Sequence, residues 1–410
     1  MADTSVETAV NANLHDLQGT WGPYWHDTLR GTAIFVTSTQ NLSRVITTDA
    51  GVSWINTAIT SGQNMRNVAV FSDREVPGLS TDLLSFAWLN AASNEVRFRT
   101  IDLGDGTLGT ERVIDSGVTI GAARVAHIAL TKAANGDLGV AFVTGTEIEF
   151  YVSTDGGENW TKKADVFESA TEADYCMLFP ADVDDGDMVA IFWDISASEI
   201  SLKMFDASAD TWTETTISGG ITMTSSVANM SMDGAVRISD KHVLMFAHTA
   251  TDDTGDDVLT WDLTVDSIAS PTVIAKTNIL TNTAESGQGC MLVVNQTSGS
   301  IKDDVHVAII VGNPTWNSTT DMKIFKSTDG MGTWDSGTTY QEAAADDIRM
   351  CSSGRIVHDS GGFFQPIFYN DDLSELFVNL PNDIPMAAVA AAASLVYHSI
   401  NQAMRALRAR

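Results

Sequence analysis

Short runs of β-branched, aromatic and aliphatic residues recur along most of this chain, and turn residues separate them. Residues 126–132, 138–144 and 147–153 form three such runs in succession, and a fourth run spans 161–166. Runs of this length, bounded by Gly, Asp and Asn, predict β-strands. Four strands within about 45 residues predict one blade of a β-propeller.

The same cycle recurs along the chain, at intervals typical of propeller blades. Its second strand can be placed at residues 32–37, 84–89, 138–144, 188–194, 242–248, 305–311 and 363–369. We therefore predict an all-β, seven-bladed β-propeller over residues 31–380, with six blades as the alternative if one unit is an insertion. The last unit lacks an obvious fourth strand. We expect segment 1–30 to supply it and close the ring, because closure removes exposed sheet edges.

A polar motif lies between the third and fourth strands of several units. TTDAGVSW starts at Thr47 and STDGGENW at Ser153, and both fit S/T-x-D-x-G-x-x-W; STDGMGTW at Ser327 shifts the glycine by one place. In such a turn the aspartate accepts backbone hydrogen bonds, glycine supplies a positive φ, and tryptophan packs on the neighbouring blade. We therefore predict structural roles for Asp49, Gly51, Trp54, Asp155, Gly157, Trp160, Asp329 and Trp334.

On these motifs the chain resembles the BNR (Asp-box) repeat propellers of the sialidase-like superfamily. The sialidase branch implies three arginines that clamp a substrate carboxylate, an aspartate acid/base and a tyrosine nucleophile backed by glutamate. Its Arg-Ile-Pro tripeptide is absent here. Arg355 and Tyr369 are the remaining catalytic candidates, and Arg30, Arg66 and Arg237 also lie near strand starts. A non-enzymatic propeller is therefore favoured, and a sialidase-like glycoside hydrolase or lyase is the alternative.

The charge balance narrows the possible partners. The 410 residues include 53 Asp and Glu but 23 Lys and Arg, which gives a net charge of −30. Nucleic acid is excluded as a partner because phosphate binding needs a basic face. Self-repulsion of this size is screened in molar salt, where the Debye length falls to about 3 Å. We interpret the composition as adaptation to high salt, with an acidic protein of ordinary environments as the alternative.

Cofactor chemistry finds little support in the motifs. The three cysteines form no C-x-x-C pair, so neither zinc nor a disulfide framework is predicted. Two acidic clusters, at 182–187 and 252–257, have oxygen ligands around a glycine but lack EF-hand spacing. We expect hydrated loops and no cofactor. Calcium remains a possibility at Asp182, Asp184 and Asp187.

The composition changes after residue 380. Residues 381–385 contain two prolines that predict a linker and a helix start, and 386–410 is rich in alanine. Apolar residues there recur in steps of four and three, which predicts a helix with a heptad seam for assembly. The seam positions are Val389, Ala393, Val396, Ile400, Ala403 and Leu407. A membrane anchor over 384–400 is the rival interpretation, but that stretch is shorter than the roughly 20 residues of a membrane span.

Together these features favour a structural protein of a virus particle. The N-terminus shows no secretory signal, and lysis would release a particle component made in the host cytoplasm. We expect a propeller that projects from the capsid vertex or tail of a tailed virus with a halophilic, archaeal host. Its partners would be other virion proteins, copies of itself through the helix, and a host-surface glycan or glycoprotein. A cellular scaffold propeller is a further alternative.

Overall fold

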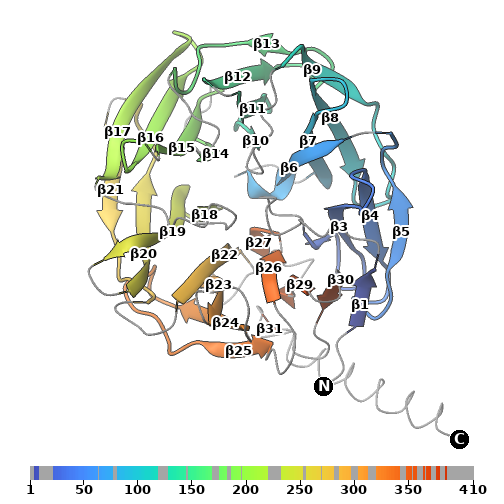
Figure 1. Ribbon diagram of the computed structural model, residues 1–410. Coiled ribbons are helices and arrows are strands. Elements are labelled where there is room, and N and C mark those ends of the chain that lie inside the picture. Colours follow the sequence, from blue (N-terminus) through green and yellow to red (C-terminus); the bar gives the residue numbers. More distant parts are fainter. Residues whose placement is uncertain are drawn as a thin grey trace, which may run out of the picture.

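Seven blades form a closed ring in the computed structural model of this chain (Figure 1). The structure describes residues 4–8, 22–62, 64–76, 81–118, 128–144, 146–168, 175–181, 186–194, 196–219, 232–252, 255–268, 270–280, 286–296, 303–312, 320–341, 348–352, 354–357, 363–364, 366–370, 375–378 and 384–385.

The first four blades each contain four antiparallel strands in chain order, from the inner strand to the outer one. They are β2 (Tyr24–Trp25), β3 (Gly31–Val36), β4 (Leu42–Thr47) and β5 (Ile55–Ala58); β6 (Met65–Ser72), β7 (Leu83–Asn90), β8 (Glu95–Asp102) and β9 (Arg112–Ser116); β10 (Ile128–Lys132), β11 (Leu138–Val143), β12 (Ile148–Ser153) and β13 (Thr161–Lys162); and β14 (Tyr175–Pro180), β15 (Met188–Asp194), β16 (Glu199–Asp206) and β17 (Thr211–Gly219).

The remaining blades follow the same plan with two additions. The fifth and sixth are β18 (Met232–Arg237), β19 (His242–Asp252), β20 (Gly255–Thr264) and β21 (Thr272–Ala275), then β22 (Ser286–Asn295), β23 (Val305–Gly312), β24 (Thr320–Ser327) and β25 (Thr338–Gln341). The seventh is β26 (Ile348–Ser352), β29 (Ile367–Asn370), β30 (Glu375–Val378) and β1 (Thr4–Glu7). The additions are β27 (Ile356–Val357), parallel to β22, and the pair β28 (Phe363–Phe364) with β31 (Ile384–Pro385).

The prediction of seven blades is confirmed, and six is excluded. Each interval predicted as a second strand overlaps the second strand of a blade, namely β3, β7, β11, β15, β19, β23 and β29. The last interval, 363–369, also contains β28, which belongs to a separate two-stranded sheet.

The two ends of the ring meet in the seventh blade. β1 pairs antiparallel with β30, with Thr4 opposite Val378 and Ser5 opposite Phe377. Val6 lies at the register shift between Ser5 and Glu7, and its side chain is buried in the apolar core. The N-terminal segment thus supplies the outermost strand of a sheet whose other three strands lie near the opposite end of the sequence.

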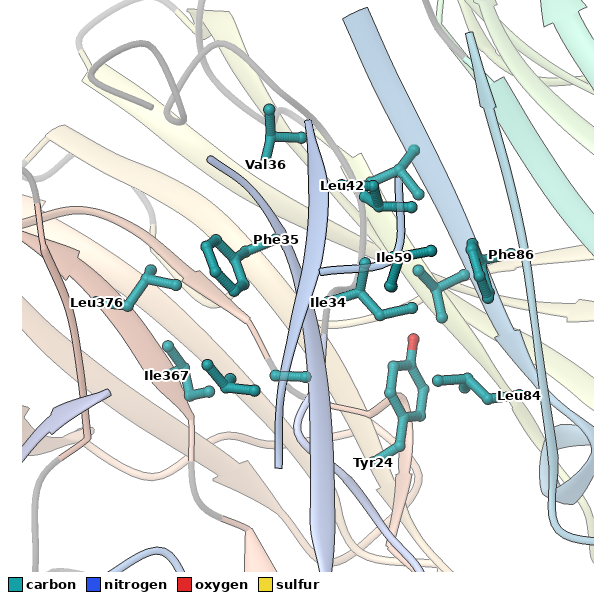
Figure 2. Close-up of a cluster of buried hydrophobic side chains, with 14 of the residues drawn as sticks. Tyr24, Ile34, Phe35, Val36, Leu42, Ile59, Leu84, Phe86, Ile367 and Leu376 are labelled. Atoms are coloured by element: carbon teal, nitrogen blue, oxygen red, sulfur yellow. The ribbon is translucent and has the colours of Figure 1, made fainter. Parts of the chain in front are cut away.

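The core consists of apolar layers between neighbouring blades. Every residue of β3 is buried, because both faces of the sheet are covered by other blades. Figure 2 shows how adjacent residues divide: Ile34 points toward Leu84 and Phe86 of the second blade, and Phe35 toward Leu376 of the seventh. Similar clusters fill each of the other blade interfaces. This two-sided burial explains why the inner strands are continuous apolar runs without alternation.

Three eight-residue turns, 47–54, 153–160 and 327–334, join third strands to fourth strands; we call them the aspartate turns. In the second, Asp155 Oδ1 accepts the backbone N–H of Asn159 at 2.9 Å and the Ser153 hydroxyl at 2.8 Å. The other two repeat both bonds around Asp49 and Asp329. Hydrogen bonds from the Asn159 side chain and backbone lower the pKa of Asp155 to about 2. The carboxylate therefore organises its own turn.

Each aspartate turn holds two successive residues in the left-handed region. The φ values are 57° and 84° at Ala50 and Gly51, and 75° and 94° at Gly156 and Gly157. In the third turn the second position is Met331, with φ 68°. Its side chain is fully buried between the fifth and sixth blades, so apolar burial offsets the strain that glycine avoids elsewhere. The displaced glycine of the sequence motif thus has a packing explanation.

The tryptophans that end these turns contact neighbouring blades in two of the three cases. Trp160 meets Phe98 of the second blade edge-on, with ring centroids 5.2 Å apart. The Trp334 indole donates to the Thr277 carbonyl of the fifth blade at 2.9 Å. Trp54 instead lies edge-on to the β2 tryptophan of its own blade, with centroids 6.4 Å apart.

The predicted tail is described only at its start. Ile384 and Pro385 form β31, so the linker is not free of sheet structure as the prolines suggested. The helix predicted over 386–410 and its seam lie outside the described residues. Within the described ranges, no helix is long and apolar enough to cross a membrane.

The two glycines of the second aspartate turn offer a matched test of the packing. A Cβ at Gly157 would lie 2.2 Å from the Phe98 ring, whereas a Cβ at Gly156 would meet nothing within 4 Å. We expect Gly156→Ala to cost about 1 kcal/mol of unfolding free energy from left-handed strain alone. Gly157→Ala should cost roughly 1–3 kcal/mol more from overpacking. Urea denaturation of the two variants measures the difference, and equal midpoints would contradict the proposed contact.

Candidate functional site

The two catalytic candidates from the sequence lie in different environments. Tyr369 is fully buried in β29, within the apolar cluster shared by the seventh, first and second blades. Arg355 lies just before β27, with 11% of its side chain exposed, and pairs with Asp233. The structure therefore places the tyrosine in the core of a blade and the arginine against the inner strands of the ring.

Arg237 does not join Arg355 in a substrate clamp. Arg237 ends β18 and pairs with Asp240 at 2.6 Å and with Asp262 at 3.1 Å. It lies four residues from Asp233 along the strand, a separation of about 13 Å. Arg30 is half-buried in the loop before β3, and the side chain of Arg66 lies outside the described structure.

Arg355 and five side chains around it form a group that we call the axial cluster. They come from β2, from the short 3-10 helix η2 (Asp73–Glu75), from β14 and β18, and from the turn before β27. Figure 1 shows β18 and β27 near the centre of the ring. The members are Tyr24, Glu75, Tyr175, Phe179, Asp233 and Arg355.

Arg355 binds neighbours on several sides. Its Nη2 lies 3.2 Å from Asp233 Oδ1, and its guanidinium carbon lies 5.3 Å from the centre of the Phe179 ring. Its carbonyl oxygen accepts the Val294 backbone N–H at 3.0 Å. Burial alone would lower the pKa of Arg355, but the charges of Asp233 and Glu75 outweigh it and raise that pKa. The guanidinium is thus a cross-link between blades whose charge is balanced internally.

The two carboxyl groups of the axial cluster are almost completely buried. Asp233 is 1% exposed, and its Oδ2 accepts the Leu292 backbone N–H at 2.9 Å. Burial raises the pKa of Asp233, although Arg355 opposes this effect. Glu75 is 3% exposed, and burial raises its pKa to about 7 despite the charge of Arg355. Glu75 can therefore exchange a proton near neutral pH, beside one fixed positive charge.

The two tyrosines line the same cluster. Tyr175 is 5% exposed, and burial followed by the charge of Asp233 raises the pKa of its phenol. Tyr24 is 4% exposed, and its ring packs beside Leu84 in the apolar core (Figure 2). A protonatable carboxyl, an arginine and two phenols form an acid–base set in principle, but the carboxyl and both phenols are buried.

The segment that carries Glu75 is held by three blades. Asp73 of η2 accepts hydrogen bonds from Lys132 of the third blade and from Thr81. Arg74 Nη1 donates to the Trp25 carbonyl of the first blade at 2.9 Å. A small displacement of Glu75 would therefore disturb several interfaces, which fixes the carboxyl in position.

The calcium candidates are only partly described. Asp182 and Asp184 lie outside the described residues. Asp187 is 1% exposed, and its Oδ1 accepts the Ala207 backbone N–H at 2.8 Å. Within the ranges that the structure describes, no group of three or more potential metal ligands occurs.

Sequence reasoning missed Glu75 and Asp233. Asp233 is a charged residue inside an inner strand whose other positions are almost all apolar, and that irregularity was visible in the sequence. Nothing in the sequence paired it with Arg355, 122 positions later, because only closure of the ring brings the two together.

The fold defines the class of protein as a seven-bladed β-propeller, and comparisons with known proteins agree. No family model matches the chain, and no curated protein matches it. A solved ulvan lyase, a polysaccharide lyase, aligns over 92% of this chain and 94% of its own, with a TM-score of 0.55 and 9% identity. The same lyase bound to a saccharide aligns with a TM-score of 0.52 and 10% identity, over 92% of this chain and 94% of its own. A leech intramolecular trans-sialidase aligns with a TM-score of 0.48 and 10% identity, over 83% of this chain and 70% of its own. Identities this low show similarity of fold alone.

The raised pKa of Glu75 predicts a pH-dependent stability. The carboxyl has an ordinary pKa of 4.5 when unfolded and about 7 when folded, so the folded state binds more protons between these values. The Glu75 contribution to stability is therefore fully present below pH 4.5 and is lost as the pH rises through 7, by up to about 3 kcal/mol. Glu75→Gln should remove that slope. Urea midpoints at pH 5 and 7.5, compared between wild type and variant, measure it; parallel pH profiles would contradict the assignment.

Proposed function

We propose that this chain is a non-enzymatic structural and binding protein of a virus particle. In this proposal the propeller projects from a capsid vertex or tail and faces a host-surface glycan or protein. The C-terminal segment joins it to copies of itself and to other virion proteins. The host would be halophilic and archaeal, in keeping with the net charge of −30.

The observation that carries the non-enzymatic part is the state of Arg355. A carboxylate clamp needs a guanidinium that faces the substrate with its charge unneutralised. Arg355 instead pairs with the buried Asp233 and covers the Phe179 ring. The other catalytic candidate, Tyr369, has no exposed surface. The arrangement favours a role in holding the ring together.

The aspartate turns support placing the chain among the Asp-box propellers. They occupy the same point of three blades and share the Ser or Thr, Asp and Trp positions. Their hydrogen bonds are satisfied within the turn, so their contribution is to stability. Sequence variation in other loops of such a scaffold would then set what it binds.

Self-assembly through the C-terminal segment is tested by light scattering in molar salt. A version that ends at Pro385 keeps the β28–β31 pair and removes the predicted helix. We expect the full chain to form a defined oligomer and the shortened chain to be a monomer, because the heptad seam would be the contact.

Point variants provide the control for that experiment. Val396→Asp and Ile400→Asp fall on the predicted seam, whereas Ser399→Asp adds the same charge between seam positions. The first two should dissociate the oligomer and the third should not. A full-length monomer would contradict self-assembly, and finding the protein in uninfected cells by immunoblot would contradict the virion assignment.

A sialidase-like hydrolase or lyase is the second candidate, and Glu75 is the observation that favours it. A carboxyl with a pKa of about 7 beside an arginine and two tyrosines is suited to proton transfer. Polysaccharide cleavage is also the activity of one propeller with a similar fold. Turnover of fluorogenic glycosides or polyuronates in high salt, abolished by Glu75→Gln and Arg355→Ala, would establish this candidate. No turnover by wild type would leave the binding role.

A further inference from the structure

Among the residues that the structure describes, no carboxylate pairs with two arginines at the interface of the first and second blades. Arg44 lies in β4 and is 7% exposed, so its side chain is almost completely buried. Its Nε and Nη1 atoms are buried without a hydrogen-bond partner in the described structure. Arg99 lies in β8 and is half-buried. A buried charge without a partner is costly, so the site needs an explanation.

The two guanidinium groups reach the same place in the fold. Arg99 Nε donates to the Gly109 carbonyl at 2.7 Å, and its Nη1 donates to the Ile59 carbonyl of the first blade at 3.2 Å. Both nitrogens on the Arg44 fork lie 3.8 Å from the position of a Cβ on Gly106. Gly106 and Gly109 belong to one connection, between β8 and β9. Burial, and after it the charge of Arg99, lowers the pKa of Arg44, which is consistent with this proximity.

Carboxylates of that connection are engaged elsewhere. Asp102 Oδ1 accepts the Gly104 N–H at 2.8 Å, and Asp105 Oδ1 accepts the Thr107 N–H at 2.7 Å. Hydrogen bonds within its own turn are the main cause of the lowered pKa of Asp105, and the charge of Arg30 adds to them. No ion pair joins Arg44 or Arg99 to an acidic group within the described residues.

The other buried cations show how unusual this pair is. Acidic residues outnumber basic ones by 53 to 23 in this chain. Nearly buried basic side chains elsewhere each have a carboxylate, as in Lys132–Asp73, Arg74–Asp82, Arg237–Asp262 and Arg355–Asp233. A chain with such an excess of acid nevertheless leaves two adjacent guanidinium groups unbalanced, and an external anion would supply the missing charge.

We propose that Arg44 and Arg99 form a binding site for a tetrahedral oxyanion of the sulfate class, between the first and second blades. Two positive charges match a dianion, and the planar guanidinium fork matches oxygen pairs on it. Arg44 forms the buried floor, and Arg99, which is half-buried, forms the accessible side. The ligand is either free inorganic sulfate or a sulfate ester on a polysaccharide. The proposal is independent of whether the propeller is an enzyme.

Titration of the full chain with sodium sulfate at constant ionic strength tests the site by calorimetry and by thermal melting. Wild type should show saturable heat and a saturable rise in melting temperature. Arg44→Met should weaken sulfate binding roughly tenfold or more, as loss of a charge-assisted fork requires. General salting-out stabilisation by sulfate is not saturable and should be the same in both proteins.

Arg97→Met is the matched control, because Arg97 lies two residues from Arg99 on the same strand but already pairs with Glu95 and Glu111. It should bind sulfate as wild type does. In sulfate-free buffer of low ionic strength, Arg44→Met should melt at or above the wild-type temperature, because an unbalanced buried charge is removed. A purely structural arginine would give the opposite sign. If Arg44→Met does not fold, Arg99→Gln replaces it in the titration.

A sulfated disaccharide and its desulfated form distinguish the two sources. Tighter binding of the sulfated sugar than of free sulfate, lost in Arg44→Met, identifies a polysaccharide ester; binding of free sulfate alone identifies the inorganic ion. Absence of saturable binding by wild type, or equal binding by Arg44→Met and wild type, would overturn the proposal.

Discussion

Burial of both faces of every blade is the constraint on which this structure depends. A single four-stranded sheet cannot cover both of its faces, so each blade relies on two neighbours. The first and last blades have a second neighbour only when the ring is closed. The pairing of β1 with β30 provides that closure. The apolar layers on either side of β3, with Ile34 on one face and Phe35 on the other, show the result.

Closure also creates an axis where inner strands converge, and charge buried there must be balanced within the molecule. Arg355 lies between Asp233 and the Phe179 ring, and Glu75 is held nearby by η2. The resulting cluster connects blades through charge as well as apolar contact. Because the cluster is almost completely buried, Arg355 acts here as a structural cross-link and not as part of a substrate clamp. For the same reason, a pKa of about 7 at Glu75 need not indicate catalysis.

The contacts between blades away from the axis are of a different kind from those at the axis. The aspartate turns satisfy their own hydrogen bonds and leave a tryptophan for blade contacts. Arg44 and Arg99 form the exception at the first interface, where positive charge lacks an internal counterpart. Function in this propeller would therefore be sought at blade edges and loops as much as at the axis, in keeping with a scaffold whose loops carry specificity.

The sequence alone was enough to predict the second strand of each blade, a ring of seven blades and the aspartate turns, because each of these signals lies within one blade-length repeat. Even the third turn, which has Met331 where the other two have glycine, is identified by its remaining residues. The axial cluster and the Arg44–Arg99 pair were decided only by the tertiary structure. Asp233 and Arg355 are 122 positions apart, and Arg44 and Arg99 are 55 apart. Their proximity follows from the curvature of a closed ring, which no local pattern of residues encodes.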